Sequence, residues 1–322
     1  MTPMPSTEER RVEAALAAAE GWPGVREGET IRTVERPGMT LAVRRRAASA
    51  DGLEPALFVH GLGGSSRNWS SLMELLAGEV ECEALDLPGF GASPPPASGD
   101  YSVYGHARAV LRELESSGRG PVHLFGNSLG GAVVTRVAAL RPDLVRSLTL
   151  ISPALPELPP QRTALPTALL GGPGMSRLLR RLTRASSPEQ RARDVLSLCY
   201  GDPSRITPEE FSAAKAELER RQSLPYFWDS LTRSARGLVN AYTLGGQQSL
   251  WRQAERVMVP TLLVYGVRDR LVSYRMARRA CRAFGASRLV VLPDAGHVAM
   301  MEYPDLVAEA FRDFRAGTTW EG

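Results

Sequence analysis

The sequence predicts an α/β fold, in which a doubly wound, mostly parallel sheet carries one long helical insertion. Short apolar runs bounded by Gly or Pro recur along the chain, helical segments lie between them, and residues 153–254 interrupt the alternation. Runs that are apolar throughout are typical of strands buried on both faces of a parallel sheet. The chain has 322 residues, 43% of them hydrophobic and 23% charged, which is enough apolar material for a sizeable core.

Two weaker strands are expected first, with Pro37 and Gly38 forming the turn between them. The expected strands are residues 30–34, 39–44, 56–59, 82–85, 122–125, 148–151, 261–265 and 289–292. Helices are expected at residues 7–19, 104–115, 129–140 and 276–284. Because helices alternate with strands, the sheet should be parallel and its crossovers right-handed.

The segment that interrupts this alternation begins with a Pro-rich stretch and is then mostly helical. Its expected helices are residues 174–184, 188–198, 208–221 and 226–241, separated by Pro and Gly. The predicted organisation is therefore a core of residues 1–152 and 255–322, with residues 153–254 as a helical cap.

Charge and cysteine content exclude several classes of protein. Lys215 is the only lysine, and the many arginines alternate with Asp and Glu, so no basic stripe indicates nucleic-acid binding. Cys82, Cys199 and Cys281 are odd in number and widely spaced, which favours free thiols in a reducing cytoplasm over disulfides or a zinc site. Residues 1–20 do not resemble a signal peptide, and no run reaches the roughly 18 apolar residues of a membrane span.

The sharpest chemical signal is the sequence G-N-S-L-G at residues 126–130, between a predicted strand and a predicted helix. A serine on such a tight turn presents its hydroxyl clear of the backbone, which is the arrangement of a nucleophile elbow. Gly126 and Gly130 allow the strand and the helix to approach, and the helix N-terminus favours developing negative charge. Ser128 is therefore the predicted nucleophile.

A serine nucleophile needs a base, and the chain contains four histidines. His123 lies inside a predicted strand, where core packing is expected, and His106 is expected on the surface or behind the site. His60 opens the sequence H-G-L-G-G, a loop that is expected to supply an oxyanion donor instead. His297 follows the last predicted strand directly, so we predict that it is the base.

The base needs a carboxylate to fix its tautomer. Asp269 follows a buried strand, and the chain order Ser128, Asp269, His297 is the order found with this kind of elbow. Asp294 is the rival, although it is poorly placed to face a ring three residues away on the same loop. Asp269 could also form a plain surface ion pair with its flanking arginines, but the catalytic interpretation is favoured.

The tetrahedral intermediate needs preorganised donors for its oxyanion. The backbone N–H of Leu129, directly after the nucleophile, is one expected donor. The second should come from the loop that begins at His60, with Leu62 as the first candidate and Gly63 as the next. The alternative is that this glycine-rich stretch is only a flexible loop.

Together these motifs resemble the α/β-hydrolase superfamily, in its capped esterase, lipase and C–C hydrolase branch, over about residues 30–315. The segment from Asp86 to Ser93 resembles the family's D-x-x-G-x-G-x-S loop, in which those two residues are expected to hydrogen-bond. The resemblance implies an eight-stranded core, residues 153–254 as a lid, and neither a metal nor an organic cofactor. A serine nucleophile differs from the aspartate of haloalkane dehalogenases and epoxide hydrolases. The loop at His60 lacks both the proline of those enzymes and the HGGG run of the hormone-sensitive-lipase-like esterases.

The predicted activity is hydrolysis of a carboxylic ester with a hydrophobic acyl or aryl group through an acyl-enzyme. Residues expected to line the pocket are Gly63, Leu271 and Val298, beside Leu62 and Leu129, and the insertion residues Tyr226, Phe227 and Trp228, which could equally be core packing. Arg162, Arg177 and Arg180 could bind an acidic substrate, although a solvated helix face is favoured. A C–C bond hydrolase, a thioesterase, a cofactor-free perhydrolase and a non-catalytic binding protein remain open. The expected partner is a small molecule, and the oligomeric state stays open.

Overall fold

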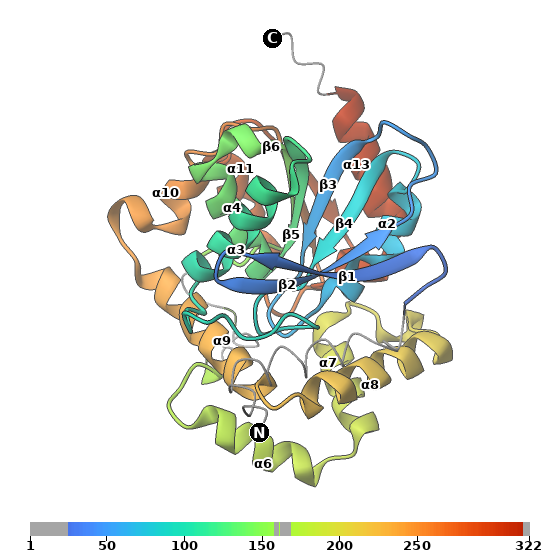
Figure 1. Ribbon diagram of the computed structural model, residues 1–322, viewed down its shortest axis with the longest axis vertical. Coiled ribbons are helices and arrows are strands. Elements are labelled where there is room, and N and C mark those ends of the chain that lie inside the picture. The colour runs from blue at the N-terminus through green and yellow to red at the C-terminus, as the bar shows by residue number, and fades with distance from the viewer. Residues whose placement is uncertain (1–24, 158–160, 162–168, 318–322) are drawn as a thin grey trace, which may run out of the picture.

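The computed structural model describes residues 25–157, 161 and 169–317, and it contains the expected twisted sheet (Figure 1). The strands are β1 (Glu29–Arg36), β2 (Met39–Arg46), β3 (Glu54–Val59), β4 (Val80–Leu85), β5 (Val122–Asn127), β6 (Val145–Ile151), β7 (Thr261–Gly266) and β8 (Ser287–Leu292). Their order is β1-β2-β4-β3-β5-β6-β7-β8. Only β2 runs antiparallel to its neighbours, and all pairs from β4 to β8 are parallel. The sheet of the prediction is confirmed.

Helices cover both faces of the sheet. The α-helices of the described residues are α2 (Ser70–Leu76), α3 (Val103–Ser117), α4 (Leu129–Leu140), α6 (Met175–Ala185), α7 (Pro188–Cys199), α8 (Pro208–Ser223), α9 (Phe227–Thr243), α10 (Leu250–Ala254), α11 (Ala277–Ala283), α12 (Ala299–Glu302) and α13 (Pro304–Gly317). One apolar cluster joins the sheet to α3, α4 and α10, and a second joins it to α2, α12 and α13. The helix expected at residues 7–19 lies outside the described residues.

The two clusters follow from the alternation of side chains along each central strand. In β3, Leu57 and Val59 belong to the cluster with α3 and α4, whereas Ala56 and Phe58 belong to the cluster with α2 and α13. The ring of Phe58 stacks on that of Phe125, with centroids 4.3 Å apart. Both faces of β3 are therefore buried, which explains why its sequence is apolar throughout.

The insertion, residues 153–254, connects β6 to β7, and its helices α6 to α9 gather at one end of the sheet (Figure 1). All four expected helices of the insertion are present. Helix α9 packs on α3, where Tyr101 hydrogen-bonds Ser230 and His106 Nε2 hydrogen-bonds Ser234 Oγ, both at 3.0 Å. His106 is thus fully buried. Of the two positions expected for His106, the surface one is wrong because α9, which is distant in sequence, covers this side of α3.

Parallel strands deliver their carboxyl ends to one edge of a sheet, where functional loops gather. In this chain the loops after β3, β5, β7 and β8 carry Leu62, Ser128, Asp269 and His297. The fold therefore brings the four predicted site segments to the same edge, although they are spread over more than two thirds of the sequence.

Candidate active site

Ser128 occupies a strained turn between β5 and α4. Its backbone angles are φ 53° and ψ −118°, a left-handed conformation that costs energy for a residue with a side chain. A Cβ on Gly130 would lie 2.2 Å from the carbonyl oxygen of Val59, and one on Gly126 would lie 2.7 Å from the carbonyl oxygen of Gly130. Only glycine fits at both positions, as the elbow interpretation expects.

The Asp269 carboxylate and the His297 ring are joined by a hydrogen bond. Nδ1 of His297 lies 2.9 Å from Oδ2 of Asp269, and both side chains are buried. The other carboxylate oxygen accepts the backbone N–H groups of Leu271 at 2.7 Å and Val272 at 2.9 Å. A carboxylate held in this way is an acceptor, so it favours the tautomer with the proton on Nδ1 and leaves Nε2 available as a base.

The electrostatics of Asp269 favour its charged form. Burial opposes ionisation, but the positive potential of His297, its hydrogen bond and the two backbone N–H groups together hold the pKa of Asp269 below its usual value. The rival Asp294 is exposed and forms an ion pair with Arg268 at 2.6 Å. Arg268 is therefore paired elsewhere, and Asp269 is buried rather than part of a surface ion pair.

Asn127, which sequence reasoning did not single out, ties the elbow to the histidine loop. Its Nδ2 donates to the backbone carbonyl of His297 at 2.9 Å and to that of Ile151 at 3.0 Å. The hydrogen bonds of these described residues include none between the Ser128 hydroxyl and the His297 ring. Asn127 therefore links the elbow to the backbone of the histidine loop, while Asp269 holds the ring.

The loop after β3 forms a tight turn beside the elbow. The N–H of Gly64 donates to the carbonyl of Gly61 at 3.0 Å, and Gly63 has φ +71°, as the third position of a type II turn requires. A Cβ on Gly61 would lie 3.1 Å from the Cβ of Ser128. Leu62 therefore lies on a turn that contacts the elbow.

The other histidines have structural partners. His60 is buried, with Nδ1 2.8 Å from the carbonyl of Gly61 and Nε2 accepting the N–H of Leu87 at 3.0 Å, and burial lowers its pKa. His123 is buried in β5, 2.7 Å from the Ser147 hydroxyl. The core position expected for His123 is confirmed, and His297 is the histidine that pairs with Asp269.

The loop from Asp86 to Ser93 is held as expected, with one difference in the atoms used. The Ser93 hydroxyl donates to the backbone carbonyl of Asp86 at 2.6 Å, not to its carboxylate. That carboxylate instead accepts the N–H groups of Ser66 at 2.5 Å and Ala92 at 2.9 Å. Asp86 thereby fixes the loop after β4 to the loop after β3.

Glu302, also absent from the sequence-based candidates, fastens the insertion to the histidine loop. Its buried carboxylate accepts the N–H groups of Gly296 at 2.7 Å, Gly201 at 3.1 Å and Asp202 at 2.8 Å. The N–H of His297 itself donates to the carbonyl of Cys199 at 2.7 Å, where α7 ends. The Glu302 carboxylate thus connects the histidine loop to the insertion.

Helix α8 makes a second attachment, to the turn at Leu62. Nη1 of Arg221 donates to the carbonyl of Gly63, and Arg221 Nε lies 3.4 Å from Glu217 Oε1. Glu217 is buried and accepts the Ser65 hydroxyl at 3.1 Å. A charged pair from the insertion therefore holds the turn that carries the expected oxyanion donor.

The expected pocket residues differ in position. Tyr226, Phe227 and Trp228 are buried at the start of α9, and the last two rings are 5.1 Å apart, edge to face. Leu231, one turn further along α9, would be 3.1 Å from a Cβ on Gly63, so it contacts the turn after β3 and is an additional candidate. Val298 packs in the apolar cluster with α2 and α12. The hydrogen bond of Leu271 to Asp269 involves only its backbone.

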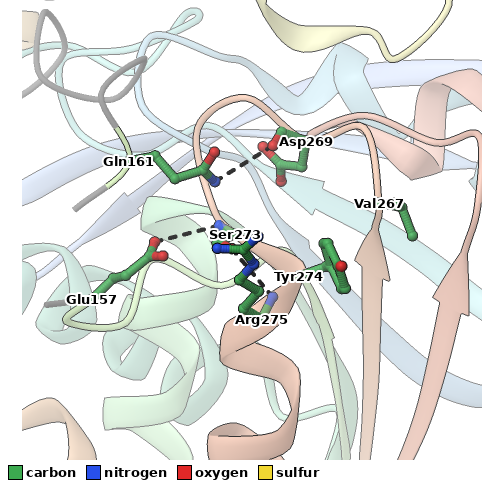
Figure 2. A pocket seen from close by; sticks show the side chains of 7 residues that line it. All are labelled: Glu157, Gln161, Val267, Asp269, Ser273, Tyr274 and Arg275. Carbon is green, nitrogen blue, oxygen red and sulfur yellow. Dashed lines mark hydrogen bonds between the residues drawn. The ribbon is translucent and has the colours of Figure 1, made fainter. Parts of the chain in front are cut away.

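A cavity of about 390 Å³ lies beside Asp269 (Figure 2). The described residues that line it are Glu157, Gln161, Val267, Asp269, Ser273, Tyr274 and Arg275, and Ser128 is not among them. Gln161 Nε2 donates to the Asp269 carbonyl at 3.5 Å, and burial raises the pKa of Glu157. The cavity is therefore lined by Asp269 but not by Ser128. Arg162 falls outside the described residues.

The chain is similar in sequence to two named proteins. The dihydrolipoyllysine-residue acetyltransferase component of the acetoin cleaving system of Cupriavidus necator is 29% identical over 264 residues, 80% of this chain. The chain spans only 62% of that protein's length. The pimeloyl-[acyl-carrier protein] methyl ester esterase of Neisseria meningitidis is 27% identical over 286 residues, which are 85% of this chain and 98% of that one.

Among solved structures, that of a membrane phospholipase A superposes with a TM-score of 0.73 at 23% identity, covering 96% of this chain and 92% of the other. In the described part of the chain, no helix combines the length and apolarity needed to span a membrane. The family model of the alpha/beta hydrolase fold matches residues 55–304, which include the strands β4 to β8 and the insertion. The chain therefore belongs to the α/β-hydrolase fold family.

Proposed function

We propose that the protein hydrolyses carboxylic esters with a hydrophobic acyl or aryl group, using Ser128 as nucleophile, His297 as base and Asp269 as the orienting acid. The observation that carries the proposal is the buried hydrogen bond of 2.9 Å between His297 and Asp269, on a loop tied by Asn127 to the strained elbow of Ser128. The esterase among the relatives supports the substrate class.

In the proposed reaction, His297 Nε2 removes the proton of Ser128 as the hydroxyl oxygen attacks the ester carbonyl. The backbone N–H groups of Leu62 and Leu129 bind the oxyanion of the tetrahedral intermediate. His297 then protonates the leaving alcohol, and water hydrolyses the acyl-enzyme with the same base. Asp269 stays ionised throughout and stabilises the charged ring, in keeping with its lowered pKa.

The insertion would serve as the lid of this site. Residues 199–221 already contact the loops of His297 and Leu62 through Cys199, Glu217 and Arg221. The aromatic start of α9 and Leu231 would then supply apolar surface to the acyl or aryl group, together with Gly63, Leu271 and Val298. The domain boundaries of this proposal are residues 1–152 and 255–322 for the core and 153–254 for the lid.

The test is hydrolysis of p-nitrophenyl esters with acyl chains from short to long, comparing wild type with Ser128→Ala. We expect Ser128→Ala to lower kcat by at least about a thousandfold, because no other group replaces the nucleophile. Asp269→Asn should lower kcat by a similar order, since the ring loses its preferred tautomer. Ser98→Ala, at an exposed turn, is the matched control and should retain full activity.

A fluorophosphonate probe separates the alternatives. If the probe labels wild type but not Ser128→Ala while no ester is turned over, the substrate to be tested is a thioester or a compound whose C–C bond is cleaved by the same residues. An unlabelled wild type would favour a non-catalytic binding protein. Equal ester turnover by wild type and Ser128→Ala would show that Ser128 is not the nucleophile.

A further inference from the structure

Helix α6, Met175–Ala185, has two chemically distinct sides. Its sequence MSRLLRRLTRA places Leu178, Leu182 and Ala185 on neighbouring turns, because residues three and four apart lie side by side on a helix. Arg177 and Arg181 form the adjoining row by the same spacing. A helix with one apolar and one cationic side needs two different surroundings.

Only part of this helix is packed. Leu179 and Thr183 are half-buried, and α6 contacts α9. In contrast, Leu178 is 46% exposed, Leu182 56%, and Leu169, just before the helix, 68%. The apolar row of Leu178, Leu182 and Ala185 therefore faces outward at the end of the insertion farthest from the sheet (Figure 1). Grouped exposed leucines indicate a surface that is covered in use.

Along the sequence, the charges beside these leucines are all of one sign. No Asp or Glu occurs between Glu157 and Glu189, a stretch that contains Arg162, Arg177, Arg180, Arg181 and Arg184. Ion pairs in the insertion lie on α7, α8 and α10, and those of the described residues do not include Arg177 or Arg181. The cations next to the exposed leucines are thus available to an external anion.

We propose that this surface, the α6 patch (Leu169, Leu178, Leu182, Arg177 and Arg181), binds an anionic lipid membrane. The leucines enter the boundary between head groups and acyl chains, and the arginines contact the lipid phosphates while their aliphatic stems cover apolar surface. The helix lies in the plane of the interface and does not cross it. This inference concerns binding alone and does not depend on the proposed ester hydrolysis.

The combination of groups distinguishes a lipid surface from other partners. A nucleic acid would be met by cations without a row of exposed leucines, because phosphate contacts supply its binding. A purely apolar partner would leave the unneutralised arginines desolvated without a counter-charge. An anionic membrane satisfies both sides of α6 at once, since it offers phosphates above an apolar layer.

The experiment is co-sedimentation of the full chain with vesicles, using Ser128→Ala protein so that no turnover alters the lipid. One vesicle population is pure phosphatidylcholine, and the other contains about one third phosphatidylglycerol. We expect binding to the anionic vesicles only, with a loss of binding at about 0.5 M salt, where surface charges are screened. The double variants L178Q/L182Q and R177Q/R181Q should each bind roughly tenfold more weakly.

Matched controls carry the same chemical changes elsewhere. Leu140→Gln alters a leucine 48% exposed at the end of α4, and R278Q/R282Q removes two exposed arginines from α11. Both controls should bind within twofold of the parent, and circular dichroism should show all variants folded. The proposal is overturned if the parent binds neither vesicle, binds both equally, or loses as much binding in the controls. It is also overturned if the parent is a dimer that L178Q/L182Q converts to a monomer, because the patch then belongs to a second copy.

Discussion

The two ends of the insertion meet their surroundings in opposite ways. At the inner end, residues 199–221 are fixed to the loops of His297 and Leu62 by buried carboxylates, those of Glu302 and Glu217. At the outer end, α6 rests on α9 and exposes Leu178 and Leu182. Polar groups are thus buried where the insertion meets the core, and apolar groups are exposed where it meets solvent.

This inversion shows what each end is built for. A buried carboxylate that accepts several N–H groups gives directional bonds and one defined geometry, which suits loops that hold reacting groups. Exposed leucines give no stability to the isolated chain, so their value must come from an external partner. The inner end therefore supports the loops of the candidate site, and the outer end is suited to contact with an external partner.

Of the changes at the two ends of the insertion, the largest effect is expected at Glu302. Glu302→Ala leaves the N–H groups of Gly296, Gly201 and Asp202 without their acceptor, so we expect a loss of about 4 kcal/mol of unfolding free energy and about a hundredfold in kcat. Glu302→Gln keeps one acceptor oxygen, so its unfolding free energy and kcat should lie between those of wild type and Glu302→Ala. Thermal melts and ester kinetics measure both quantities. Glu309→Ala, an exposed glutamate on α13, is the control. Full activity in Glu302→Ala would show that the inner end does not position His297.

A smaller effect, dependent on pH, is expected at Glu217. Burial opposes its ionisation, but the charges of Arg221 and Arg220 hold its pKa below the usual 4.5. A lowered folded pKa gives stability that is present above the unfolded pKa and lost as pH falls through the folded value. Glu217→Gln should therefore cost about 3 kcal/mol at pH 7, and the difference from wild type should shrink below about pH 4.5.

Urea unfolding of wild type and Glu217→Gln from neutral to acid pH measures this dependence. Glu219→Gln, a neighbour on the exposed side of α8, should show little effect at any pH. The acid limit is pH 3.5, about one unit below the reference pKa. If the difference in unfolding free energy between wild type and Glu217→Gln stays constant down to that pH, the charge of Glu217 does not stabilise the inner end.

The smallest effect is expected at the outer end. Arg236 of α9 donates to the carbonyls of Gly171 at 2.7 Å and Gly172 at 3.3 Å, just before α6. Arg236→Ala should cost about 1 kcal/mol or less, because its side chain is exposed. Turnover of short, soluble esters should be unchanged. A fall in kcat comparable to that of Glu302→Ala would mean that the two ends are coupled.

Sequence reasoning reached much of the molecule, and its successes share a physical basis. Strands buried on both faces must be apolar throughout, and the elbow requires Gly126 and Gly130 because backbone atoms occupy the space of a side chain. Asp269 and His297 each follow a strand that the sequence marks clearly, and the structure joins them by a hydrogen bond. Their catalytic roles and that of Ser128 stay predictions.

Local features could be predicted from the residues alone: the alternation of strands and helices, the turn at Ser128, and the loops that carry Asp269 and His297. The folded chain was needed to show which buried polar groups meet. Glu302 contacts Asp202 across 100 residues, Arg221 reaches Gly63 across 158, and α9 buries His106. In sequence, a buried glutamate reads like a solvated one, because the residue letter records the charge and not the partner that compensates it on folding.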